Sequence, residues 1–167
     1  MKRDMLKRMC VTALLTAICV LVTAFVSLPL AVTGNINMGD CITMVACMLL
    51  GLWYAPAVGA MGGFIADLIS GYAAYAPVTL VAKLALALVM CLFCRKRLSL
   101  ARCALGIALG GIAMTACYFV YELLLYGLPV AAANALFCML QAGINGVAAL
   151  ALYPLVKKVK SLKREYL

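Results

Sequence analysis

The chain has 167 residues, of which 68% are hydrophobic and only 11% charged, and its mean hydropathy is +1.16. Because soluble domains carry about a quarter charged residues, this composition excludes a protein with water as its main solvent. At about 20 residues per membrane-spanning helix, the length allows about six spans. No room is left for a nucleotidase, a nucleic-acid-binding module or a lid domain.

Six apolar segments follow one another along the chain, and each predicts a helix. The first is longer than the apolar part of a secretory signal, so we interpret it as a retained membrane helix. The second and third are separated near Ala55-Pro56 and are short for a full span. Gly127-Leu128-Pro129 separates the fifth from the sixth. The expected helices are residues 10–32, 38–54, 56–70, 77–94, 101–126 and 130–156.

The net charge of +9 comes from Lys and Arg clusters at residues 2–8, 95–102 and 157–164. Basic residues beside apolar segments mark the cytoplasmic ends of membrane helices. Six helices place all three clusters on one side, and the loops on the other side contain no Lys or Arg. We therefore expect one integral membrane domain over residues 1–167, an all-α bundle of six transmembrane helices with both termini cytoplasmic. Its basic ends favour contact with anionic membrane lipid, not nucleic acid.

The chain has nine cysteines and no histidine. The cysteine count is odd, and Cys91 and Cys94 form a C-x-x-C motif without a second pair at metal-ligand spacing. We interpret the cysteines as small apolar residues of the helices and expect neither a metal nor a cofactor. Glycine pairs in Gly59–Gly63 and Gly106–Gly110 permit close helix contact, and we expect them to pack helices within the bundle.

Four ionisable residues lie in or beside the apolar segments: Asp40, Asp67, Lys83 and Glu122. A charge at the centre of a membrane helix costs about 2.5–3.5 kcal/mol, so such residues commonly mark a ligand site or pathway. All four fall in the predicted outer halves of their helices. A conduit needs polar groups at several depths, so this pattern favours a pocket that opens outward.

Helical spacing adds further candidate residues to this pocket. Aromatic walls with a few converging polar groups suit a flat, polar small molecule. Tyr72, Tyr75 and Tyr126 could instead form an interfacial aromatic belt, and Gln141 and Asn145 could join helices. The candidates are Thr79, Tyr118, Tyr121, Tyr126, the loop residues Tyr72 and Tyr75, and Asn134, Gln141 and Asn145.

Several ionisable candidates also have a structural interpretation. Asn37 and Asp40 match a helix N-cap followed by an acid in the first turn. Asp67 could pair with Lys83 and join two helices. Glu122 has no basic neighbour other than Lys83, which makes it the strongest candidate for ligand contact.

Over residues 8–90 the chain contains an ordered set of motifs. They are Asn35-Ile36-Asn37-Met38-Gly39-Asp40, Gly51, Pro56, Gly59-Ala60-Met61-Gly62-Gly63, Asp67, Tyr75-Ala76-Pro77 and Lys83. This set resembles the substrate-binding S components of energy-coupling factor (ECF) transporters. The closest subgroup is that of the hydroxymethylpyrimidine, pyridoxine and riboflavin-type vitamin components.

The resemblance implies a six-helix protein in the plasma membrane of a prokaryote that captures a vitamin at the outer face. It would dock on an ECF coupling transmembrane subunit driven by two ATP-binding subunits. The resemblance further implies that Ala13 and Ala17, in an Ala-x-x-x-Ala pattern, contact the coupling subunit. The chain contains no GxxxxGK[ST] motif, so on this interpretation its partners supply the energy.

We therefore expect a binding and translocation subunit for a pyrimidine or pyridine heterocycle, such as hydroxymethylpyrimidine or pyridoxine. Three acids against one lysine disfavour a strongly anionic ligand. The alternative is a stand-alone homodimeric secondary carrier driven by a proton gradient. An enzyme is disfavoured because the chain has no histidine and no closely spaced pair of carboxylates. The expected ligand-site residues are Asn37, Asp67, Tyr75, Lys83, Tyr118, Glu122, Asn134 and Gln141, with Lys83 and Asp67 holding the charge balance.

Overall fold

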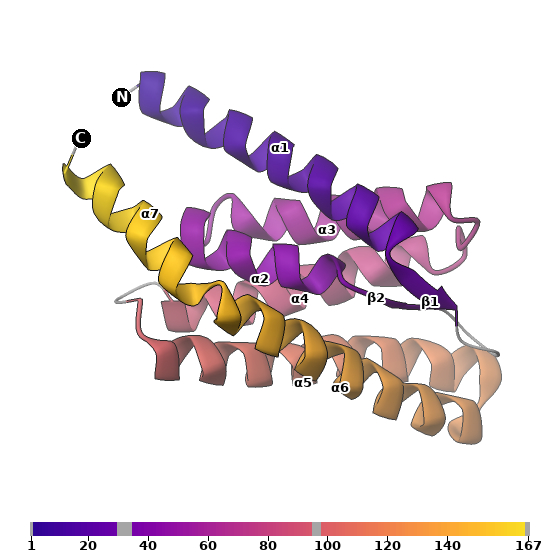
Figure 1. Cartoon of the computed structure of the whole chain (residues 1–167). Coiled ribbons are helices and arrows are strands. Elements are labelled where there is room, and N and C mark those ends of the chain that lie inside the picture. Colours follow the sequence, from indigo (N-terminus) through magenta and orange to yellow (C-terminus); the bar gives the residue numbers. More distant parts are fainter. Residues whose placement is uncertain (1, 30–34, 95–97, 166–167) are drawn as a thin grey trace.

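The computed structural model describes residues 2–29, 35–94 and 98–165 and is built mainly from helices (Figure 1). A short antiparallel ribbon joins the first two of them. The helices are α1 Lys2–Phe25, α2 Gly39–Leu50, α3 Ala55–Ile69, α4 Ala76–Cys94, α5 Leu100–Tyr126, α6 Leu128–Ala151 and α7 Tyr153–Glu165, and the strands are β1 Ser27–Pro29 and β2 Asn35–Asn37.

Four helices of the described chain, α1, α4, α5 and α6, are long and apolar enough to cross a membrane. Helices α2 and α3 are also apolar but have only 12 and 15 residues. An apolar helix of this length is short for a bilayer unless neighbouring helices enclose it. The fold is that of a multi-pass helical membrane protein, and the number of six spans stays a prediction.

The first expected helix, residues 10–32, is wrong at both ends. Helix α1 begins at Lys2 and ends at Phe25, after which β1 pairs with β2 with Ser27 opposite Asn37. Pro29 explains the change, because proline lacks an N–H group and disfavours helical backbone at the residue before it. Residues 30–32 of that expected helix lie outside the described residues.

The last expected helix, residues 130–156, consists of two helices. Helix α6 ends at Ala151 and α7 begins at Tyr153, so the basic tail is itself helical. Pro154 has no N–H group to continue α6, but it is tolerated in the first turn of a new helix. The other four expected helices correspond to α2–α5, although α2 ends at Leu50, before Gly51 with its positive φ of 78°.

Helix α2 lies inside the bundle. It packs on α1, α3, α4 and α6, and its side chains Met44, Met48 and Cys47 are fully buried. Glycines let the neighbours approach closely: a Cβ atom at Gly59 would come within 2.5 Å of Thr43, and one at Gly110 within 2.9 Å of the Leu86 carbonyl oxygen. The glycine pairs therefore pack helices within the bundle, as expected from their spacing.

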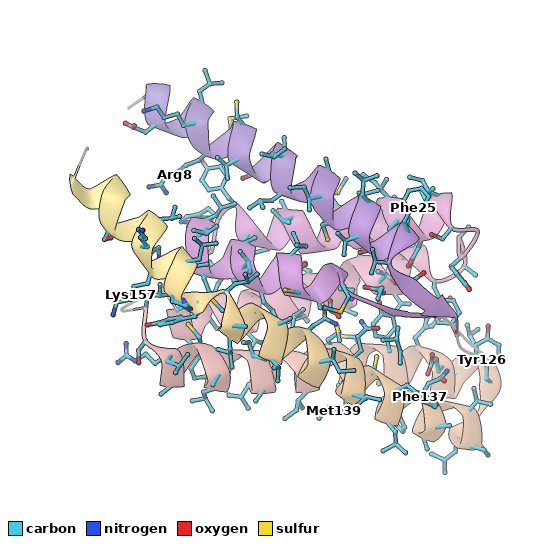
Figure 2. All side chains as sticks on the ribbon, viewed as in Figure 1. Arg8, Phe25, Tyr126, Phe137, Met139 and Lys157 are labelled. Atoms are coloured by element: carbon cyan, nitrogen blue, oxygen red, sulfur yellow. The ribbon has the colours of Figure 1, made fainter. Side chains whose placement is uncertain are left out.

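The two ends of the bundle differ. Both termini lie at one end, whereas the β1–β2 ribbon and the α3–α4 and α5–α6 turns lie at the other (Figure 1). Figure 2 shows Arg8 and Lys157 at the end with the termini and Tyr126 at the opposite end. The cytoplasmic position of the termini stays a prediction.

Candidate functional site

A cavity of about 70 Å³ lies at the ribbon end of the bundle. One buried water needs about 10–15 Å³ by this measure, so the space holds several waters. Five helices, β2 and the α3–α4 turn supply its walls. The lining residues are Thr23, Ile36, Asn37, Asp67, Tyr72, Tyr75, Thr79, Lys83, Tyr118, Glu122, Asn134, Phe137, Cys138 and Gln141.

The structure brings all the expected ligand-site residues to this one cavity. They come from β2, α3, α4, α5, α6 and the α3–α4 turn, and all of them lie toward the end opposite the termini. Tyr126 does not line the cavity and is half exposed, which fits an interfacial belt. Ala13 and Ala17 lie elsewhere, exposed on α1.

Lys83 forms an ion pair with Asp40, not with Asp67, which was the structural alternative for that acid. The Lys83 ammonium group contacts Oδ1 of Asp40, and Gln141 donates to Oδ2 of the same carboxylate. Lys83 is 3% exposed and Asp40 0%. Spacing along the chain could not identify this partner, because the first turn of α2 meets α4 only through the packing of α2 inside the bundle.

Gln141 and Asn145 of α6 hold the junction between β2 and α2. Gln141 accepts from the Asn37 N–H group at 3.1 Å. Asn145 accepts from the Cys41 N–H group at 2.8 Å and donates to the Asn37 carbonyl at 2.9 Å. Asn37 also accepts from the Gly39 N–H group at 3.1 Å, which stabilises the turn before α2. These contacts agree with the helix-joining interpretation of both amides. The N-cap interpretation of Asn37 is wrong, because Met38 occupies that position of α2, whereas Asp40 does lie in the first turn.

Glu122 and Asp67 each present a carboxylate oxygen that has no hydrogen-bond partner in the described chain. Oε1 of Glu122 accepts from Asn134 at 3.0 Å and from the Tyr75 hydroxyl at 3.4 Å, whereas Oε2 is buried and unpaired. Oδ2 of Asp67 is likewise buried and unpaired. Glu122 is only 3% exposed and Asp67 8%. Buried carboxylate oxygens normally have partners, so these two oxygens stand out as unsatisfied polar atoms of the cavity wall.

Aromatic side chains form much of the remaining wall. Tyr118 donates to Thr79 at 2.9 Å, which fixes its ring beside the cavity. Tyr75 packs edge-on against Tyr121, with ring centroids 5.5 Å apart. Tyr72 and Phe137 also line the space, and Figure 2 shows Phe137 toward the same end of the bundle as Tyr126.

Four lining residues were not identified from the sequence: Thr23, Ile36, Phe137 and Cys138. Phe137 and Cys138 lie three and four residues after Asn134, so the helical period of that face could have predicted them. Thr23 and Ile36 gave no such signal, because each lies on an element without another candidate residue at helical spacing.

The sequence matches the family model described as the ECF-type riboflavin transporter, S component, over residues 3–160. The chain belongs to this family. It is also 34% identical over 106 residues to an uncharacterized protein in the gap 3′ region of Pyrococcus woesei, an alignment that covers 63% of this chain and 71% of that protein. The S component is therefore a transporter subunit and not an enzyme, and its family acts with an ECF membrane subunit and ATPases. The hydroxymethylpyrimidine and pyridoxine subgroup stays a prediction.

Proposed function

We propose that this S component captures a water-soluble vitamin or vitamin precursor in the cavity at the ribbon end and delivers it across the plasma membrane of a prokaryote. In this proposal six helices span the membrane, both termini are cytoplasmic and the cavity faces outward. The observation that carries the proposal is that Asp67, Lys83 and Glu122 line the same cavity as several aromatic side chains. The basic residues at the opposite end support the orientation.

The ligand in this proposal is a pyrimidine or pyridine heterocycle such as hydroxymethylpyrimidine or pyridoxine. Tyr72, Tyr118 and Phe137 offer flat apolar surfaces, and Glu122 and Asp67 offer polar anchors. A cavity of about 70 Å³ is closer to the size needed for one ring than to that needed for the three fused rings of a flavin. The description of the matched family favours riboflavin, which makes riboflavin the competing ligand.

The partners in this proposal are an ECF coupling transmembrane subunit and two ATP-binding subunits. Ala13 and Ala17 are exposed on α1, where small side chains permit close contact with another helix. Because the chain contains no GxxxxGK[ST] motif, the ATP-binding subunits supply the energy.

A stand-alone secondary carrier is the second candidate, and one observation favours it. The buried carboxylates of Asp67 and Glu122 could exchange protons during transport. Uptake by vesicles that contain only this chain, with and without a proton gradient, separates the two candidates. The ECF proposal expects binding of a radiolabelled vitamin but concentrative uptake only after the coupling and ATP-binding subunits are added. Concentrative uptake by the chain alone would contradict it.

Binding to the purified chain tests the ligand directly. Radiolabelled hydroxymethylpyrimidine, pyridoxine and riboflavin are compared with a dicarboxylate such as succinate. We expect one of the single-ring compounds to bind most tightly. Tight binding of the dicarboxylate, with none of the heterocycles, would contradict the proposal. Mass spectrometry of the small molecule that copurifies with the chain identifies the natural ligand.

A further inference from the structure

The lining residues of the cavity include one cation and two acids. The cation, Lys83, is already paired with Asp40, whose other oxygen accepts from Gln141. The charge of Lys83 is therefore already balanced by a buried carboxylate. The two acids, Asp67 and Glu122, are the charged groups that remain to face a ligand.

The two acids approach the cavity from different sides. Asp67 lies on α3 and Glu122 on α5, and both helices pack along α4 between them. Each residue is more than nine-tenths buried, and each presents one oxygen that has no partner in the described residues. Asn134 and Tyr75 hold the other oxygen of Glu122, so its open oxygen is fixed in direction before a ligand arrives.

The donors around these acceptors are largely occupied by protein groups. The Tyr118 hydroxyl donates to Thr79, one N–H of Asn134 is given to Glu122, and Gln141 donates to Asp40. The cavity thus presents two open carboxylate oxygens, while these three donors are already used by protein groups. An anionic ligand would add negative charge to two buried carboxylates, which costs free energy in a medium of low polarity.

On the basis of the proposed function, the geometry points to a ligand with a protonated amine or several N–H groups, held between Asp67 and Glu122. The ring of this ligand lies against the aromatic walls, and its N–H groups donate to Oδ2 of Asp67 and Oε2 of Glu122. Charge-assisted hydrogen bonds of this kind are stronger than those of a neutral hydroxyl group. Glu122 and Asp67 therefore select the charge of the substrate.

Three pyridine compounds of one shape test this assignment. Pyridoxamine, pyridoxine and 4-pyridoxic acid carry an aminomethyl, a hydroxymethyl and a carboxylate group at the same ring position. Their binding to the purified full-length chain in nanodiscs is measured by equilibrium dialysis at neutral pH. We expect the amine to bind about 10-fold or more tightly than the alcohol, and the acid to bind more weakly than either.

Variants locate the source of this preference. In Glu122→Gln and Asp67→Asn we expect the affinity for the amine to fall about 10- to 100-fold, with a smaller change for the alcohol. Asp4→Asn is the matched control, because it makes the same chemical change far from the cavity and leaves the preference unchanged. Thermal unfolding of each variant shows that it is folded. A second series, benzylamine, benzyl alcohol and benzoate, tests the same charge order on a bare ring.

The outcomes separate this inference from the proposed function. Equal or tighter binding of the acid in both series overturns the inference, as does an amine preference that survives in both variants. Binding of riboflavin alone, with neither amine bound, also overturns it but leaves vitamin capture intact. Failure of every vitamin to bind overturns both.

Discussion

Lys83 on α4 pairs with Asp40 in the first turn of α2, and the pair is almost completely buried beside the cavity. The pairing joins the helix that carries the cavity wall to the helix at the centre of the bundle. It also leaves Asp67 open toward the cavity. The Lys83–Asp40 pair thus affects both the stability of the bundle and the net charge of the cavity wall.

Removal of the cation is expected to destabilise the fold more than removal of the pair. In Lys83→Met, Asp40 is left as an uncompensated buried charge, and we expect a loss of about 3–5 kcal/mol in the free energy of unfolding. The double variant Asp40→Asn with Lys83→Met should regain much of that loss, because no unpaired charge remains. Thermal unfolding in detergent measures both. Equal melting temperatures for the single and the double variant would contradict this role of the pair.

Asn145 and Asn134 lie on the same helix but have different expected roles. Asn145 holds the Cys41 N–H group and the Asn37 carbonyl, so Asn145→Ala leaves buried backbone groups without partners. We expect the free energy of unfolding to fall by about 1–3 kcal/mol for each buried group left unpaired. Asn134 contacts Glu122 at the cavity, so Asn134→Ala should weaken ligand binding with a smaller effect on thermal stability. A larger loss of thermal stability in Asn134→Ala, together with a larger loss of ligand binding in Asn145→Ala, would contradict these assignments.

The helical segments and the depth of the site could be predicted because each depends on short-range patterns. Apolar length indicated the helices, and the positions of Asp67, Lys83 and Glu122 within their segments indicated a common level in the bundle. Hydropathy failed past Phe25, because residues 26–32 (VSLPLAV) continue the apolar run although β1 lies within them. Pro29 was the local signal for the ribbon, and Pro154 was the signal that separates α6 from α7.

Partners within the site could not be predicted, because they depend on how distant helices pack. Spacing placed Asp67 and Lys83 at similar depth, but it could not reveal that Asp40 occupies the ammonium group. It also could not distinguish Gln141, which holds Asp40 and Asn37, from Glu122, which keeps an open oxygen. The expected ligand contacts of Gln141 and Glu122 both stay predictions, and the open oxygen makes Glu122 the stronger candidate.

Gly110 tests how closely α4 and α5 approach, with Gly143 on α6 as its control. A Cβ atom at Gly110 would lie 2.9 Å from the Leu86 carbonyl oxygen, which is part of the backbone and has little freedom to move. We expect Gly110→Ala to destabilise the bundle by about 1–3 kcal/mol through overpacking. Gly143 on α6 is exposed and faces open space, so Gly143→Ala is the matched control and should be neutral in thermal unfolding. Equal effects of the two changes would show that close contact at Gly110 is unimportant.

The exposed alanines of α1 provide a test of docking that is separate from ligand capture. Ala13→Leu with Ala17→Leu adds bulk where close helix contact is proposed, and we expect at least a tenfold loss of vitamin uptake when the coupling and ATP-binding subunits are present. Ligand binding to the isolated chain should stay unchanged, because neither alanine lines the cavity. Ala108→Leu makes the same change on an exposed position of α5 and should leave uptake near its original level. Copurification of the coupling subunit with each variant measures assembly. Full assembly and uptake in the α1 double variant would place the docking surface elsewhere on the chain.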